Sequence, residues 1–244
     1  MLILQNLSKT YSKGQVKAVD NLNLQVSDGE IFGFLGPNGA GKSTTIKMMT
    51  GILQPDGGNI LLNGVSIKQE PYVFKHNIGY VPDNHATYEK LTGIEYLNFM
   101  GSIYDVPADQ LEQKAKTLAQ KFGIINALND QIKTYSHGMK QKLVVIGSLL
   151  HDPDLWVLDE PLTGLDPQSA YELKTYMREH ADKGHTVFFS SHVIDVVEKV
   201  CDRVGIIKDG KLVAVGTIDE LKAQNSSLEE YFLNLTKKEE LAEE

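Results

Sequence analysis

The sequence contains little cysteine, no long apolar run and few arginines. Its single cysteine, Cys201, excludes an internal disulfide and a metal site built from cysteines alone. The longest run of apolar and small residues, 143–150, is far shorter than the roughly 20 residues that a membrane-spanning helix needs. No basic segment followed by an apolar one opens the chain, so we expect no secretory signal. These features favour a soluble, intracellular protein.

Positive charge is also scarce. The chain has 24 lysines and arginines against 32 aspartates and glutamates, for a formal net charge of -8. No dense basic block with interleaved aromatics is present, so we expect no nucleic-acid partner. Arg178 and Arg203 are the only arginines, and neither lies in a glycine-rich motif. An arginine finger is therefore not expected to stabilise charge in a reaction.

The pattern of apolar residues predicts strands in both halves of the chain. Alternation over 22–26 indicates a half-buried strand. Short apolar runs are typical of strands buried on both faces, and they occur at 31–35, 155–158 and 187–189. Asn63-Gly64 and Asp209-Gly210 are turn pairs that predict hairpins.

Helical periodicity dominates the middle of the chain, from about 91 to 122. One apolar stripe there consists of Leu111, Ala115, Leu118, Ala119 and Phe122. Asp166-Pro167 is a good N-cap and first-turn pair, and it precedes a helix face made of Leu173, Tyr176, Met177 and His180. Two capping boxes predict short helices near the end, Thr217 with Glu220 and Ser226 with Glu229. Strands on both sides of a helical segment indicate an α/β core with a helical insertion.

The segment after the strand at 31–35 matches the phosphate-loop pattern G-x-x-x-x-G-K-[ST]. It consists of Gly36, Pro37, Asn38, Gly39, Ala40, Gly41, Lys42, Ser43 and Thr44. The glycines allow backbone amides to surround phosphates, Lys42 would neutralise their oxygens, and Ser43 would bind Mg²⁺. A helix predicted from Ser43 to Thr50 would point its positive end at the same group. Strand, loop and helix together favour nucleotide binding over a plain glycine turn.

The strand at 155–158 ends in two carboxylates, Asp159 and Glu160. At the carboxyl end of a strand, Asp159 can hold the Mg²⁺ shell and Glu160 can polarise an attacking water. Adjacent acids at a strand end also occur as solubilising residues, so this pair alone leaves both readings open.

With these two motifs, the chain resembles the ATP-binding subunit of ABC transporters over nearly its whole length. The family's signature corresponds to the residues 135–139, Tyr-Ser-His-Gly-Met, which lie upstream of Asp159-Glu160. The residues 162–166 resemble the D-loop, and Ser190-Ser191-His192 resembles the strand end that carries the switch histidine. Tyr11 stands where the family stacks an aromatic side chain on adenine.

The resemblance implies a P-loop NTPase core with an antiparallel β subdomain and an inserted helical subdomain. We expect one ABC ATPase domain over 1–244, with the nucleotide-binding core at 1–85 and 151–217. The helical insertion with the signature would occupy 86–150, and a helical tail would occupy 218–244.

It also implies ATP and Mg²⁺ as cofactors and a second ATPase subunit, in the simplest case a homodimer. In the family, the signature contacts ATP held by the other subunit, and here Ser136 and Gly138 would supply a hydroxyl, amides and a helix dipole for that contact. His192 would hydrogen-bond the γ-phosphate and the attacking water. Dimerisation would then be part of the mechanism.

Three residues depart from the family pattern. Asp83 replaces a glutamine that meets Mg²⁺ and water, and because aspartate is shorter it would reach the metal through a water. His137 replaces the first signature glycine, where its side chain lies either near the partner's phosphates or in solvent, and Met139 replaces the signature glutamine. Since Lys42, Glu160 and His192 are retained, we expect an active ATPase.

Divergent signatures of this kind are similar to those of the subfamily that works with separate membrane subunits to export drugs, peptides or lipids. This implies a transmembrane permease partner and a peripheral position on the cytoplasmic face of the membrane. Aromatic residues in and near the helical insertion are docking candidates, although core packing is an equal alternative for each: Tyr88, Tyr96, Phe99 and Tyr104.

The alternative function is an ATP-gated clamp that acts on a ribosome or DNA. Such relatives usually carry paired ATPase domains, long coiled coils or basic extensions, and none of these features is recognised here. A GTPase or nucleotide kinase fits less well, because the sequence contains no Asn-Lys-x-Asp motif and no recognisable second substrate pocket.

Overall fold

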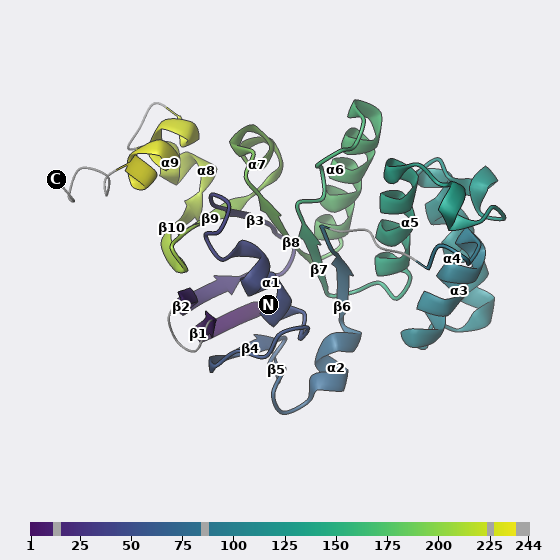
Figure 1. Ribbon diagram of the computed structural model, residues 1–244, viewed down its shortest axis with the longest axis horizontal. Coiled ribbons are helices and arrows are strands. Elements are labelled where there is room, and N and C mark those ends of the chain that lie inside the picture. The colour runs from purple at the N-terminus through teal and green to yellow at the C-terminus, as the bar shows by residue number, and fades with distance from the viewer. Residues whose placement is uncertain (12–15, 84–87, 224–226, 238–244) are drawn as a thin grey trace.

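The computed structural model in Figure 1 describes residues 1–11, 16–83, 88–223 and 227–237. Two sheets form its centre. The antiparallel sheet has the order β2 (Val16–Val26), β1 (Leu2–Tyr11), β4 (Gly57–Leu62) and β5 (Val65–Ser66). The larger sheet has the order β10 (Lys211–Thr217), β9 (Arg203–Lys208), β3 (Ile31–Leu35), β8 (Thr186–Ser191), β7 (Leu155–Asp159) and β6 (Ile78–Val81).

The larger sheet is parallel from β9 to β6, and only β10 runs antiparallel to its neighbour. Strand β3 is apolar throughout because both of its faces are buried. Phe32 and Phe34 pack into the core shared with the antiparallel sheet, whereas Ile31 and Leu35 pack into the core on the other face. The strands predicted at 31–35, 155–158 and 187–189 are confirmed, and all of their residues are buried.

Helices cover both faces of the larger sheet. Helix α1 (Lys42–Met49) contributes Ile46, Met48 and Met49 to the core between the sheets. Helices α3 (Gly93–Ile103), α4 (Ala108–Lys121) and α5 (His137–Leu149) form a group at one end of the molecule (Figure 1). The other α-helices are α2 (Pro71–His76), α6 (Pro167–Asp182), α7 (Ile194–Val200), α8 (Ile218–Lys222) and α9 (Leu228–Lys237), and 3-10 turns span Ile125–Ala127 and Ile132–Thr134.

The helical periodicity predicted over 91–122 corresponds to two helices, α3 and α4. The chain leaves the helical conformation between them, where Asp105 has a φ of 51° and Pro107 has no amide hydrogen to donate. The apolar stripe from Leu111 to Phe122 is buried, as predicted. The spacing of apolar side chains therefore predicted the buried face of α4 but not the break between α3 and α4.

Helix caps follow the predicted pattern at two of three places. Asp166 accepts a hydrogen bond from the Ser169 amide at 3.0 Å, and Thr217 forms the predicted capping box with Glu220. Ser226 of the third predicted box lies outside the described residues. One position later, the Ser227 hydroxyl accepts a hydrogen bond from the Glu230 amide at 3.1 Å.

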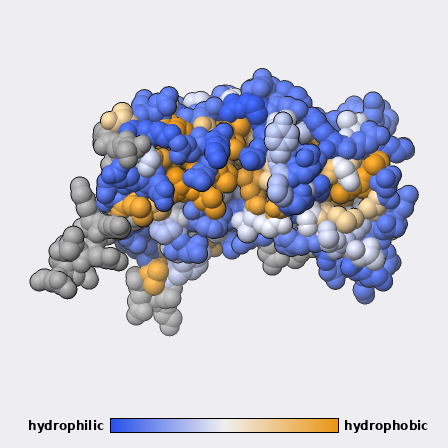
Figure 2. All heavy atoms as spheres, turned by 90° about the horizontal axis from the view of Figure 1, so that it is seen from above, coloured by the Kyte–Doolittle hydropathy of each residue, from blue (hydrophilic) through white to orange (hydrophobic). Residues whose placement is uncertain are grey.

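Apolar residues also reach the surface. Figure 2 shows an apolar band across the middle of the face seen from above, bordered by polar residues. Within the described ranges, however, no helix combines the length and apolar character that crossing a bilayer requires.

Candidate active site

The phosphate loop connects β3 to α1, and one of its glycines is required by sterics. Gly41 caps α1 with a φ of 108°, a conformation that L side chains rarely adopt. A Cβ atom there would lie 2.3 Å from the carbonyl oxygen of Ala18. The predicted order of strand, loop and helix is present, with the helix beginning at Lys42, one residue before the predicted start, and its positive end directed at the loop.

Lys42 lies inside the phosphate loop. Its Nζ donates hydrogen bonds to the carbonyls of Gly36 at 2.6 Å and Pro37 at 3.2 Å. The same atom is 3.7 Å from Glu160 Oε1. Burial lowers the pKa of Lys42, while the charges of Glu160 and Asp159 act in the opposite direction. The lysine thus links the loop to Glu160, which follows β7.

Asp159 ends β7 and is fully buried. Because β7 and β8 are paired in parallel with Asp159 opposite Ser190, the Ser190 hydroxyl donates to Asp159 Oδ1 at 2.6 Å. The same hydroxyl accepts a hydrogen bond from the Glu160 amide at 3.0 Å. Burial raises the pKa of Asp159, and the hydroxyls of Ser190 and nearby Ser43 lower it. One serine therefore holds both acidic residues.

Glu160 has an unusual backbone. Its φ is 50°, in the left-handed region. Residues other than glycine adopt this conformation at a cost in free energy, and such strained residues are typical of functional sites. Its Oε2 lies 2.9 Å from His192 Nδ1, and this histidine directly follows β8. The side chain of His192 is 49% exposed, so the pair faces solvent on one side.

The oxygen donors near Asp159 fit a magnesium ion. Asp159 Oδ2 is buried and forms no hydrogen bond within the described ranges. The Ser43 hydroxyl lies near it, and the exposed Asp83 is close enough for its charge to raise the pKa of Asp159. No cluster of three or more His, Cys, Asp or Glu side chains in the described ranges forms a metal site on its own. Mg²⁺ suits a site of few protein ligands, since it retains water and takes phosphate oxygens.

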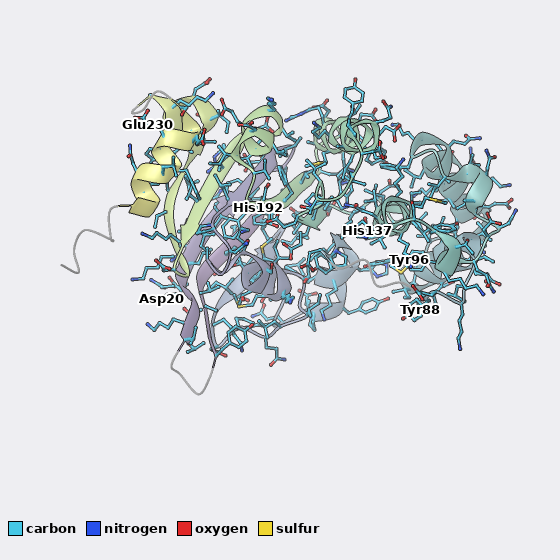
Figure 3. The ribbon with its side chains drawn as sticks, turned by 45° about the horizontal axis from the view of Figure 1, so that its top comes forward. Asp20, Tyr88, Tyr96, His137, His192 and Glu230 are labelled. Atoms are coloured by element: carbon cyan, nitrogen blue, oxygen red, sulfur yellow. The ribbon has the colours of Figure 1, made fainter. Side chains whose placement is uncertain are left out.

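The signature residues lie at the start of α5. Ser136 caps α5 by accepting a hydrogen bond from the Met139 amide at 3.2 Å. His137 is exposed, and a Cβ built on Gly164 would lie 3.4 Å from its ring. In Figure 3, His137 lies apart from His192, on the side of the helices α3 to α5. The structure therefore brings Lys42, Asp159, Glu160 and His192 together but places the signature beside the loop 162–166.

Two predicted features have clear positions but no contact that tests their roles. Tyr11 ends β1 opposite Val16 and is 41% exposed, and Gly138 lies near Leu165. The sequence patterns include Ser190 only as part of a motif, and they do not indicate Gln141. Ser190 lies near the end of the strand next to the one that ends in the acidic pair. The sequence would indicate its role only if the pairing of β7 with β8 were known.

Comparisons with known proteins agree with this geometry. Residues 19–163 match the sequence model of the family described as "ABC transporter". The linearmycin resistance ATP-binding protein LnrL of Bacillus subtilis is 38% identical over 91% of this chain and 70% of its own length. The daunorubicin/doxorubicin resistance ATP-binding protein DrrA of Streptomyces peucetius is 38% identical over 86% of this chain and 64% of its own.

A solved structure described as the ATP binding subunit of an ABC transporter is 32% identical. It superposes with a TM-score of 0.91 over 97% of this chain and 100% of its own. The predicted P-loop NTPase fold, with its antiparallel sheet and its group of inserted helices, is thereby confirmed. The chain belongs to the ABC transporter family, as one of its ATP-binding and ATP-hydrolysing proteins.

Proposed function

We propose that two copies of this chain enclose two MgATP molecules and that hydrolysis drives export through a separate membrane subunit. One observation carries the proposal: His137 of the signature lies beside the loop 162–166 and apart from His192, which contacts Glu160 (Figure 3). A site that uses both groups of residues therefore needs a second chain. A homodimer supplies both groups twice, once in each of its two sites.

Within each site, the phosphate loop from Gly36 to Thr44 holds the phosphates and Tyr11 stacks on adenine. Ser43 and Asp159 would hold Mg²⁺, with Asp83 reaching it through a water, and the ion would neutralise phosphate charge. Glu160 accepts the proton of the attacking water, and Lys42 binds the phosphate oxygens.

His192, whose Nδ1 lies 2.9 Å from Glu160 Oε2, would hydrogen-bond the γ-phosphate and the attacking water. Ser136 and Gly138 of the partner subunit offer a hydroxyl, free amides and the positive end of α5 to the same nucleotide. No arginine is assigned to the site.

The pH dependence of hydrolysis should reveal the role of Ser190. Asp159 must be ionised to hold Mg²⁺, burial raises its pKa, and the Ser190 hydroxyl lowers it. In Ser190→Ala the pKa of Asp159 in the free protein rises further, so the acid limb of the kcat/KM–pH profile should move to higher pH, with a loss of roughly tenfold in kcat/KM near neutrality.

Measurement of phosphate release from pH 5 to 9 with MgATP well below its KM tests this expectation. Thr186→Val is the matched control, because its hydroxyl bonds the Ser27 carbonyl at the other end of β8. An acid limb at the same pH in Ser190→Ala and in the unmodified chain would contradict the assignment.

Export is supported by the relatives named above, which are resistance proteins for linearmycin and for daunorubicin and doxorubicin. We therefore infer a cargo of drug, peptide or lipid type and a peripheral position on the cytoplasmic face of the membrane. Nothing in the fold or the relatives favours the alternative, a clamp on a ribosome or DNA.

Two of the aromatic candidates suit a docking surface for the membrane subunit. Tyr88 is 58% exposed and Phe99 is 40% exposed, and their rings meet edge to face with centroids 5.4 Å apart. The other two do not: Tyr96 is 6% exposed and belongs to the core, and Tyr104 stacks on His151 at 3.7 Å. For Tyr96 the core-packing alternative holds, because this side chain lies on the inward face of α3 against α5.

Co-purification tests the proposed function. An affinity-tagged chain should recover an integral membrane protein from detergent-solubilised membranes of its own cells. Tyr88→Ala combined with Phe99→Ala should reduce that recovery, whereas Tyr171→Ala, an equally exposed tyrosine on α6, should not. Recovery of ribosomes or DNA alone would contradict transport.

A further inference from the structure

Helix α5 is attached to the loop that follows Glu160 in the same chain. Gln141 is 1% exposed, and its Nε2 donates a hydrogen bond to the Pro161 carbonyl. One turn earlier on the same helix face, His137 lies beside Gly164. The helix that begins with the signature is therefore hydrogen-bonded to Pro161 and lies next to Gly164 in the same loop.

Packing alone does not explain a glutamine at this position. Its second polar atom, Oε1, is buried and has no hydrogen-bond partner in the described part of the chain. A buried amide oxygen without a partner costs free energy, and an apolar side chain of similar size, such as methionine, avoids that cost. We therefore attribute the presence of glutamine at this position to its Nε2 group, which donates to the Pro161 carbonyl.

The Pro161 carbonyl lies one residue beyond the left-handed Glu160. A φ of 50° persists in a glutamate only where the surrounding contacts hold it. The Ser190 hydroxyl binds the Glu160 amide, and the Glu160 carbonyl accepts a hydrogen bond from the Thr163 amide at 3.2 Å. Gln141 adds the contact on the carboxyl side, from a helix that belongs to the inserted group.

We propose that Gln141 is a positioning residue, which fixes the backbone after Glu160 and links the signature helix to that glutamate. The proposal rests on the proposed role of Glu160 as the base. Contact between the signature and a partner's nucleotide would be transmitted through α5 to the chain's own Glu160. In this role Gln141 acts through the Pro161 carbonyl and not on the reacting atoms.

The test compares Gln141→Met with Gln168→Met. Gln168 is the matched control, because its Nε2 bonds Glu172 on the exposed surface of α6 and not the loop. In Gln141→Met, kcat for ATP hydrolysis should fall roughly tenfold to a hundredfold, while the Kd for MgATP stays within about twofold. Gln168→Met should change neither quantity. Circular dichroism checks folding, and Gln141→Leu replaces the variant if methionine does not fold.

A second measurement separates positioning of Glu160 from a general loss of structure. When Glu160→Gln is already present, adding Gln141→Met should not lower the residual rate further, because the group that Gln141 positions has lost its function. An unchanged kcat in Gln141→Met, or a loss that multiplies with that of Glu160→Gln, would overturn the inference. Normal turnover in Glu160→Gln alone would instead refute the proposed role of Glu160.

Discussion

Replacing Glu160 with glutamine should lower the rate of ATP hydrolysis by about a hundredfold or more and leave ATP binding intact. The amide keeps the shape of the side chain and can still meet His192, but it cannot accept a proton from water. General base catalysis typically contributes about 10²–10⁴ in rate, so its removal is among the largest single losses expected here. Phosphate release and the Kd for MgATP measure the two effects separately.

The same variant reports on assembly. With hydrolysis blocked, MgATP should convert Glu160→Gln from monomer to dimer in size-exclusion chromatography with light scattering. Glu179→Gln is the control for the loss of one charge, since Glu179 pairs with Lys121 at an exposed site, and it should hydrolyse ATP normally. A monomer with and without MgATP would contradict a self-sufficient homodimer and would require a membrane subunit or another ATPase chain for closure.

Gly41→Ala should weaken nucleotide binding severely. The new Cβ would lie 2.3 Å from the Ala18 carbonyl oxygen, and the φ of 108° would remain strained even if that contact were relieved. The loop must therefore change shape, and the amides that surround the phosphates move with it. We expect at least a hundredfold weaker binding of MgATP, roughly the loss of two or more hydrogen bonds to a charged group.

Gly64→Ala separates this effect from backbone strain in general. Gly64 also has a positive φ, 83°, but a Cβ there would have no neighbour within 4 Å. It lies in the turn between β4 and β5, away from the phosphate loop. Titration of both variants with a fluorescent ATP analogue should show normal affinity in Gly64→Ala. Equal affinity in the two variants would mean that the loop accommodates the methyl group.

Much of the nucleotide-binding half was determined by local sequence. The spacing from Gly36 to Thr44 specifies a loop because glycine conformations and a helix N-terminus are local properties. The apolar run 31–35 predicts a strand covered on both faces, and the cap at Asp166 predicts where α6 begins. These features depend on neighbours within a few positions in the chain, so the sequence alone was enough to find them.

The tertiary structure decided the contacts between distant residues. Ser190 reaches Asp159 and Glu160 across about thirty positions because β7 and β8 are adjacent strands, and Gln141 reaches Pro161 because α5 packs beside the end of β7. Tyr96 is buried while Tyr88 is exposed, although both are tyrosines in one segment. The left-handed backbone of Glu160 likewise has no local signal. Residue type fixes what chemistry a side chain can perform, whereas its partners and its burial depend on which elements pack together.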